Sequence, residues 1–210
     1  MKKRNCVYYI LIIWLALPSF ISAQSLKDYQ AAFNGSLKAW AQTFSNFKLS
    51  AFKQVGPPHL FDNTHKIITK NKQAFYPNYK QALSTSPNGR FTLDMYSYLL
   101  LQKRRGKFIS NGSDVEQSLL LGNIPESKWQ QIAYYGYTQR VQEIYWVNNN
   151  TFILTAVRLD AADRNLPVII IGHLKEQTLT SFETTNTDCY QKPGGYTSPK
   201  LIPLHINSVD

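Results

Sequence analysis

Two acidic side chains, Asp114 and Glu116, lie two residues apart in a stretch that the sequence predicts to be a strand. Alternate residues of a strand share a face, so the two carboxyl groups would lie roughly 6–7 Å apart. That spacing is compatible with the acid/base pair of a glycoside hydrolase. The same residues also suit a solvated strand face that begins after the Asn111-Gly112 turn, because acidic side chains are usually exposed. A hydrolase is therefore the alternative function and not the leading one.

Metal and nucleophile chemistry have weaker signatures. The histidines are His59, His65, His173 and His205, and no two of them have the i, i+4 spacing of a helical metal site. Cys189 is the only cysteine beyond the first 23 residues, which excludes a zinc site built from cysteines. The chain has no Gly-x-Ser-x-Gly elbow, P-loop or dinucleotide fingerprint. We predict no cofactor and no metal, identify no catalytic residue, and favour a protein that is not an enzyme.

The densest basic run is Lys103-Arg104-Arg105-Gly106-Lys107, between two predicted strands. It best suits a charged hairpin loop that protects strand ends, and the functional alternative is a contact with an anionic glycan, a lipid headgroup or phosphate. The nearby run Tyr134 to Tyr137 offers aromatic faces that can stack on sugars or peptides. The candidate ligand surface comprises Lys103, Arg104, Arg105, Lys107, Tyr135 and Tyr137. The positive charge is only moderate, so nucleic acid is not an expected partner.

The first 23 residues have the three parts of a secretory signal peptide. Lys2, Lys3 and Arg4 are followed by the apolar run Ile10 to Leu17, and Ala23 provides a small residue before a predicted cut at Gln24. Pro18 interrupts the run where a membrane-spanning helix would continue. We therefore expect an exported protein, periplasmic or secreted, that is soluble after cleavage. A single remaining cysteine allows no intrachain disulfide, which favours a bacterial envelope.

Residues 24–85 form the predicted N-terminal helical and loop segment. Large apolar residues recur at helical spacing from Leu26 to Phe47, so one face should be buried. Gly35 weakens a continuous helix, and two shorter helices with a kink remain open, as does a helix followed by a strand. Residues 48–85 contain the turn signals Gly56-Pro57-Pro58 and Tyr76-Pro77-Asn78, and we expect loops with one or two short strands there.

Residues 86–210 form the predicted antiparallel β domain, so the fold class is mainly β, with α+β as the minor alternative. Runs rich in aromatic and branched residues alternate with turn formers, without helices between them, which favours an antiparallel meander. The predicted strands are Phe91 to Leu101, Val115 to Leu121, Gln131 to Tyr135, Val141 to Val147, Thr151 to Leu159, Pro167 to Ile171 and Thr178 to Phe182. Asp94 would share a polar face with Thr92, Tyr96 and Tyr98.

A weak internal repeat supports the meander. Asn88, Phe91 and Leu93 match Asn149, Phe152 and Leu154, and the run Leu119 to Gly122 matches Ile169 to Gly172. The different offsets fit a longer loop around residues 102–113 in the first copy. Similarity at a fixed period is typical of blade-like units, although any two hairpins with Asn turns align about as well.

The turn Ser86-Pro87-Asn88-Gly89-Arg90 resembles the Ser-Pro-Asp-Gly-Lys turn of β-propeller blades. Together with Glu143 to Leu154, it makes residues 86–183 similar to uncharacterised exported proteins of Gram-negative bacteria. The resemblance implies a fold and a location, and it transfers no site residue. Two such units cannot close a propeller, which takes 4–8 blades.

Both faces of the hairpin around Asn148 to Asn150 are apolar, which predicts that it lies inside a sheet and is covered on both sides. The apolar stripe of Leu26 to Phe47 is the predicted cover of one side. The leading function is an envelope binding or interaction module, whose partner would be another envelope protein, an anionic glycan or a lipid surface. The alternative is a hydrolase of an extracytoplasmic polymer such as a glycan.

Overall fold

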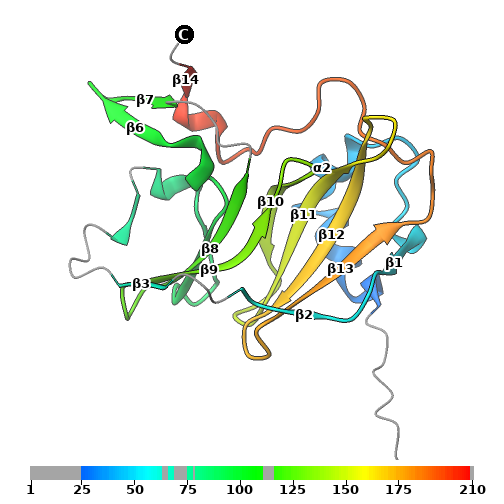
Figure 1. Ribbon diagram of the computed structural model, residues 1–210, viewed down its shortest axis with the longest axis horizontal. Coiled ribbons are helices and arrows are strands. Elements are labelled where there is room, and N and C mark those ends of the chain that lie inside the picture. Colours follow the sequence, from blue (N-terminus) through cyan, green and yellow to red (C-terminus); the bar gives the residue numbers. More distant parts are fainter. Residues whose placement is uncertain (1–24, 63–65, 69–74, 78, 111–115, 209–210) are drawn as a thin grey trace, which may run out of the picture.

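The computed structural model describes residues 25–62, 66–68, 75–77, 79–110 and 116–208. Its architecture is mainly β with antiparallel sheets and few helices, as the sequence predicts (Figure 1). The predictions for the leader (residues 1–23), His65 and Asp114 concern positions outside the described residues. Among the described residues, no helix is long and apolar enough to cross a membrane.

Two larger sheets are each built on a meander of four strands. Sheet I has the order β3-β9-β8-β5-β4 and sheet II the order β1-β13-β12-β11-β10, with β2 also paired to β13. The strands of sheet I are β3 (Lys66–Ile68), β4 (Ser84–Thr85), β5 (Phe91–Asp94), β8 (Gln117–Asn123) and β9 (Lys128–Tyr135). Those of sheet II are β1 (Phe52–Gln54), β2 (His59–Leu60), β10 (Gln139–Trp146), β11 (Thr151–Leu159), β12 (Asn165–His173) and β13 (Thr178–Thr184).

A small third sheet, of order β14-β7-β6, extends from sheet I. It consists of β6 (Leu101–Arg104), β7 (Lys107–Ser110) and β14 (Asn207–Ser208). The β6–β7 hairpin lies where the repeat predicts a longer loop in the first copy. The predicted strand Phe91 to Leu101 is therefore wrong beyond Asp94. The Asp94 carboxylate accepts the Tyr96 N–H at 2.7 Å, and a short 3-10 turn, η5 (Ser97–Leu99), redirects the chain before β6.

The predicted segment 48–85 contains more strands than expected. It supplies β1, β2, β3 and β4, and these short strands join both larger sheets. The 3-10 turn η3 (Leu49–Ala51) precedes β1, η4 (Lys80–Ala82) lies between β3 and β4, and η6 (Ile202–Leu204) precedes β14. Strands of two or three residues carry too few alternating positions to stand out in a sequence pattern.

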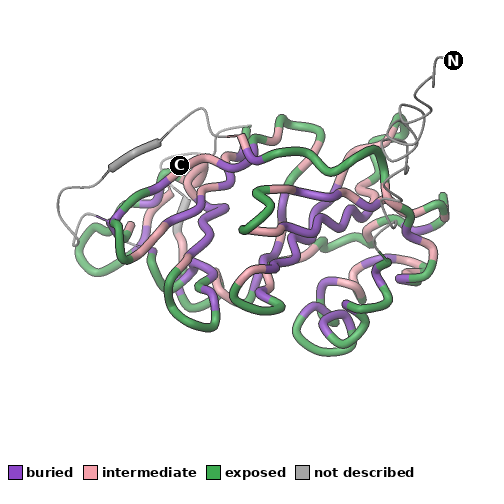
Figure 2. The backbone as a smooth tube through the Cα atoms, turned by 90° about the horizontal axis from the view of Figure 1, so that it is seen from below, coloured by how far each residue is buried: buried purple, intermediate pink, exposed green. Residues whose placement is uncertain are grey.

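Sheet II lies between two apolar layers. One of its faces packs against sheet I, where Phe152, Leu154 and Ile170 share a core with Leu93 and Leu119. Its other face packs against the N-terminal helical segment through side chains that include Ile153, Ile169, Ile171, Phe182, Phe33, Leu37 and Trp40. The prediction that the helical stripe covers the sheet is thus confirmed. Figure 2 shows the buried residues concentrated on the strands and the exposed ones on the turns.

The helical segment is broken as one of the two sequence interpretations allows. The elements are η2 (Leu26–Tyr29), α1 (Gln30–Asn34) and α2 (Lys38–Gln42). The break falls at Gly35, whose N–H still closes α1 by donating to Ala31 O at 3.0 Å. Phe44 and Phe47 follow α2 in irregular chain, and both rings pack on Trp40.

The registers test the internal repeat. Gly122 lies on β8, opposite Thr92 and Trp129, and Gly172 lies at the equivalent place on β12, opposite Phe152 and Leu179. The match of Gly122 with Gly172 is therefore confirmed. The match of Phe91 with Phe152 is off by one residue, because Thr92 is the residue opposite Gly122. A Cβ atom at Gly122 would collide with the rings of Phe75 and Trp129, and one at Gly172 would collide with the Phe152 ring.

The hairpin around Asn148 to Asn150 is only partly as predicted. Strand β11 is interior and is almost fully buried from Thr151 to Val157. Strand β10, however, is the last strand of sheet II, so the expectation that the whole hairpin lies inside the sheet is wrong. Its open edge is covered by side chains, which are described below, and its register shifts between Val141 and Glu143.

Replacing Trp40 by Ala tests how firmly the helical layer is held. Trp40 is completely buried, and its indole Nε1 donates to Gln142 Oε1 at 2.9 Å. We expect the substitution to lower the free energy of unfolding by about 3–5 kcal/mol, measured by urea titration. The control is Lys38→Ala, an exposed position of α2, which should change it by less than about 0.5 kcal/mol. A Trp40→Ala protein as stable as the Lys38→Ala protein would show that the helical layer contributes little.

Candidate functional site

The predicted basic run forms the tip of the β6–β7 hairpin. Lys103 and Arg104 end β6, Arg105 and Gly106 make the turn with positive φ, and Lys107 begins β7. All five residues are exposed. Their sequence therefore forms the charged hairpin that was expected, at the free end of the small sheet (Figure 1).

The two tyrosines of the predicted ligand surface differ in exposure. Tyr137 is 73% exposed on the turn between β9 and β10. Tyr135 is half-buried and packs against the core between the sheets, and this burial raises the pKa of its hydroxyl. Within the described residues, no hydrogen bond or ring contact joins either tyrosine to the basic run. A ligand surface made of all six residues stays a prediction.

The other sequence candidates are also dispersed. Glu116 is exposed and accepts a hydrogen bond from the Tyr134 hydroxyl. His59 lies on β2, His173 ends β12, and His205 follows η6. In the described part of the chain no three His, Cys, Asp or Glu side chains are grouped so that they could hold a metal ion.

Asp94 is buried, contrary to the polar strand face expected for it. It is 3% exposed, and its carboxylate accepts the Tyr79 hydroxyl at 2.9 Å and the Tyr96 N–H at 2.7 Å. Burial raises the pKa of this carboxyl, and the hydrogen bonds offset part of that effect. Burial and the adjacent Asp94 also raise the pKa of Tyr79. The group holds the turn after β5 in place.

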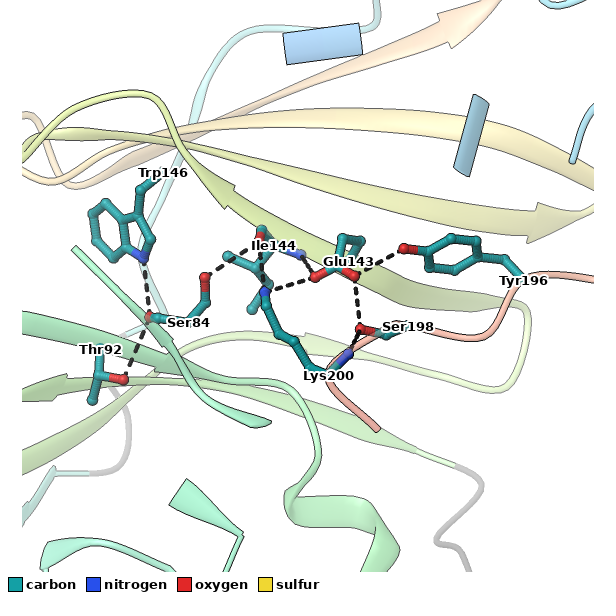
Figure 3. A network of polar contacts seen from close by, with 8 residues as sticks. All are labelled: Ser84, Thr92, Glu143, Ile144, Trp146, Tyr196, Ser198 and Lys200. Atoms are coloured by element: carbon teal, nitrogen blue, oxygen red, sulfur yellow. Dashed lines mark hydrogen bonds and ion pairs between the residues drawn. The ribbon is translucent and has the colours of Figure 1, made fainter. Parts of the chain in front are cut away.

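Glu143 anchors a second buried polar network, which Figure 3 shows beside the edge of β10. One of its oxygens accepts the Lys200 ammonium at 2.7 Å and the Ile144 N–H at 3.0 Å. The other accepts the Ser198 hydroxyl at 2.7 Å and the Tyr196 hydroxyl at 2.9 Å. Sequence reasoning missed this acid because three of its partners lie more than fifty residues away along the chain.

Electrostatics keep Glu143 ionised. Burial alone would raise the pKa of its carboxyl, but the Lys200 charge and the hydrogen bonds from Lys200, Ser198 and the Ile144 N–H outweigh it and hold the pKa below its usual value. A carboxylate whose two oxygens are saturated by four donors is poorly suited to proton transfer. The network therefore acts as a clamp that fastens the C-terminal segment to β10.

The same network closes the open edge of sheet II. Lys200 Nζ and Ser84 Oγ both donate to the Ile144 carbonyl, at 2.9 and 3.2 Å, and Trp146 Nε1 donates to the Ser84 carbonyl at 3.0 Å. Further along β10, the Gln117 amide accepts the Val141 N–H at 2.7 Å and donates to the Val141 carbonyl at 3.1 Å. Side chains thus take the place of a neighbouring strand.

Four turns, two from sheet I and two from sheet II, lie side by side and are joined by hydrogen bonds. They are the turns β4–β5 (residues 86–90), β8–β9 (124–127), β10–β11 (147–150) and β12–β13 (174–177). The Ile124 N–H donates to Arg90 O at 3.0 Å, the Asn88 N–H to Asn149 Oδ1 at 2.9 Å, and the Lys175 N–H to Asn150 Oδ1 at 2.8 Å. Asn88 and Asn149, which match in the repeat, are thus in direct contact. The two turns of sheet II are seen at the lower edge of Figure 1.

A groove follows this row of turns, and we call it the turn-end groove. One part of it, which we call the apolar cavity, has a volume of about 410 Å³ and is lined by Phe61, Phe91, Leu121, Asn123, Glu126, Lys128, Trp129, Gln130, Leu174 and Gln177. A shallower hollow of about 520 Å³, the amide hollow, shares Phe91 and Leu174 with it. A third hollow of about 360 Å³ shares Asn88 and Arg90 with the amide hollow and includes Phe75.

Asn123, which lines the apolar cavity, carries an unsatisfied polar atom. Its Oδ1 is buried and has no hydrogen-bond partner in the described part of the chain. A buried carbonyl without a partner costs free energy. The cavity therefore combines five aromatic and aliphatic residues with five polar or charged ones, and small-molecule sites likewise combine apolar walls with polar groups.

Only part of this groove could be predicted from the sequence. Ser86 to Arg90 and Asn148 to Asn150 were predicted to be turns, which is confirmed, but nothing in the sequence placed them side by side. Comparisons with protein-family models, with curated proteins and with solved structures returned no match for this chain.

Replacing Glu143 by Gln tests the clamp. The folded-state pKa of Glu143 is below its unfolded value, so its ionisation stabilises the fold above the ordinary glutamate pKa and ceases to do so as the pH falls through the folded-state pKa. We expect Glu143→Gln to lower the free energy of unfolding by about 2–4 kcal/mol at pH 7 and by clearly less at pH 3. Urea titrations at the two pH values measure both differences.

The matched control is Glu116→Gln, which removes an exposed carboxylate and should have little effect at either pH. An equal loss for Glu143→Gln at pH 3 and pH 7 would contradict a role for its charge.

Proposed function

We propose that this chain is an exported binding module that holds the apolar part of a small amphipathic ligand in the turn-end groove. The observation that carries the proposal is the apolar cavity of about 410 Å³ between the two sheets, whose walls include Phe61, Phe91 and Trp129. Small-molecule sites are typically concave, mostly apolar and supplied with a few polar groups, in this range of volume.

The rigidity of the groove also supports binding. Its rim consists of turns that hydrogen-bond to one another, and Trp129 is fixed by its Nε1 bond to Phe75 O at 2.8 Å and by stacking on the Phe75 ring. A site that is ordered before the ligand arrives loses less conformational entropy on binding. The Trp129 wall of the apolar cavity is therefore ordered without a ligand.

Export is the second part of the proposal. It rests on the basic start, the apolar run and Ala23 in the leader, and on the presence of a single cysteine after it. An envelope location would give the groove access to lipids, glycans and their fragments.

The alternative of a polymer hydrolase has less support. Glu143 is saturated by four donors, Asp94 holds a turn, and Glu116 is exposed and bound to Tyr134. Among the described acids none faces a second acid across a cleft, as a glycosidase pair would.

Binding of the neutral dye N-phenyl-1-naphthylamine tests the proposal. Its fluorescence rises in an apolar site, and we expect saturable binding of one dye per chain. Gln130→Trp places a large side chain in the apolar cavity and should weaken this binding at least about tenfold, because it removes the space for the ring.

The control is Tyr134→Trp, on the same strand but at an exposed position outside the cavity, and it should bind the dye as the unmodified protein does. Thermal melts establish that both variants are folded. Dye binding that is unchanged by Gln130→Trp, or absent from the folded protein, would refute the proposed site.

A further inference from the structure

The amide hollow, next to the apolar cavity, offers hydrogen-bond donors almost exclusively. The described residues that line it are Asn88, Arg90, Phe91, Asn148, Asn149, Asn150, Leu174 and Lys175. None of these described residues is acidic, and two carry a positive charge. Its apolar members, Phe91 and Leu174, are the two residues that it shares with the apolar cavity.

The orientations of the four asparagines are fixed by the backbone. Asn148 Oδ1 accepts the N–H groups of Asn150 and Thr151 at 2.8 and 2.9 Å, and Asn88 Oδ1 accepts that of Arg90 at 3.0 Å. The Oδ1 atoms of Asn149 and Asn150 are likewise occupied by the N–H groups of Asn88 and Lys175. A backbone N–H can only donate, so the side-chain oxygen must face it.

What remains free on these side chains is the NH₂ group. None of the four Nδ2 atoms forms a hydrogen bond with the described part of the chain, so each can donate to a ligand. Four amide donors with their own acceptors already occupied attract acceptor-rich groups and offer little to a donor.

The two cations are also available. The guanidinium of Arg90 lies over the Phe91 ring, 5.7 Å from its centroid. Neither Arg90 nor the exposed Lys175 forms an ion pair with a described residue. Two acids lie close by: Glu126, which lines the apolar cavity, pairs with Lys128 at 2.7 Å and also interacts electrostatically with Arg90, and the exposed Glu176, which follows Lys175 in the chain. The side chains that line the amide hollow therefore combine two positive charges with free amide donors, beside the apolar cavity.

We infer that the amide hollow binds the anionic group of the ligand, a carboxylate, phosphate, sulfate or sulfonate whose oxygens accept from the asparagine amides, Arg90 and Lys175. This inference rests on the proposed function, because it assigns the head of the same ligand whose apolar part occupies the neighbouring cavity. The ligand class is thus an amphipathic anion. Charge-assisted hydrogen bonds from Arg and Lys to oxyanions are shorter and stronger than neutral ones.

The experiment compares two dyes that differ by one anionic group. 8-Anilinonaphthalene-1-sulfonate carries a sulfonate that N-phenyl-1-naphthylamine lacks, and we expect the sulfonate dye to bind more tightly to the unmodified protein. The double variant Arg90→Gln/Lys175→Gln should weaken binding of the sulfonate dye about three- to tenfold and leave the neutral dye within about twofold. Higher NaCl should weaken only the sulfonate dye.

The matched control is Lys103→Gln/Arg105→Gln, which removes the same charge from the tip of the β6–β7 hairpin. It should leave the affinity of both dyes unchanged. An effect of the hairpin variant equal to that of the groove variant would show that net charge, and not the amide hollow, selects the anion, and would overturn the inference.

The outcomes separate this inference from the proposed function. Neutral-dye binding that depends on Gln130 while both dyes bind equally supports the apolar cavity and refutes the anion site. Loss of both dyes from the groove refutes both proposals. Two further arms identify the source of the anion: decanoate displaces the sulfonate dye if the natural ligand is a soluble amphiphile, and vesicles of phosphatidylcholine with phosphatidylglycerol displace it if the ligand is a lipid headgroup at a surface.

Discussion

The structure depends on how the open edge of β10 is satisfied. This strand ends sheet II, and an edge strand with unpaired N–H and C=O groups would be exposed to water or to another chain. Here Gln117 pairs with Val141 through both atoms of its amide, while Ser84 and Lys200 donate to the Ile144 carbonyl. Glu143 holds Lys200 in place for this bond. Each of these side chains comes from outside sheet II or from β10 itself.

These side-chain bonds along the β10 edge, which we call the seam, also set the arrangement of the two sheets. Gln117 and Ser84 belong to sheet I, so the bonds that close the β10 edge fix sheet I against sheet II. The apolar core between the sheets supplies most of the stabilisation, but it is not directional. The polar bonds of the seam are directional, and they bring the turns of both sheets to one end of the molecule. The turn-end groove exists because these turns lie side by side and bond to one another.

The sequence predicted the parts of the fold that leave a periodic pattern. The strands from Thr151 to Thr184 and the buried stripe around Trp40 were recognisable because their apolar residues repeat at strand or helix spacing. The seam and the groove were not recognisable. Asp94 and Glu143 look like ordinary polar strand residues until their partners, Tyr79 and Lys200, are brought close by the fold. In the same way the sequence identifies Asn88 and Asn149 as turn residues, but their contact is a property of the register of two sheets.

Hydrogen exchange of the Val141 and Ile144 amides, followed by NMR, is the most direct test of the seam. Neither N–H pairs with a neighbouring strand, and each donates to a side-chain oxygen, at 2.7 Å to Gln117 and at 3.0 Å to Glu143. If side chains close the edge, both amides should exchange as slowly as those in the interior of β11, through opening of the whole unit. Exchange as fast as that of an exposed turn amide such as Tyr137 would contradict this account and would mean that the β10 edge is open.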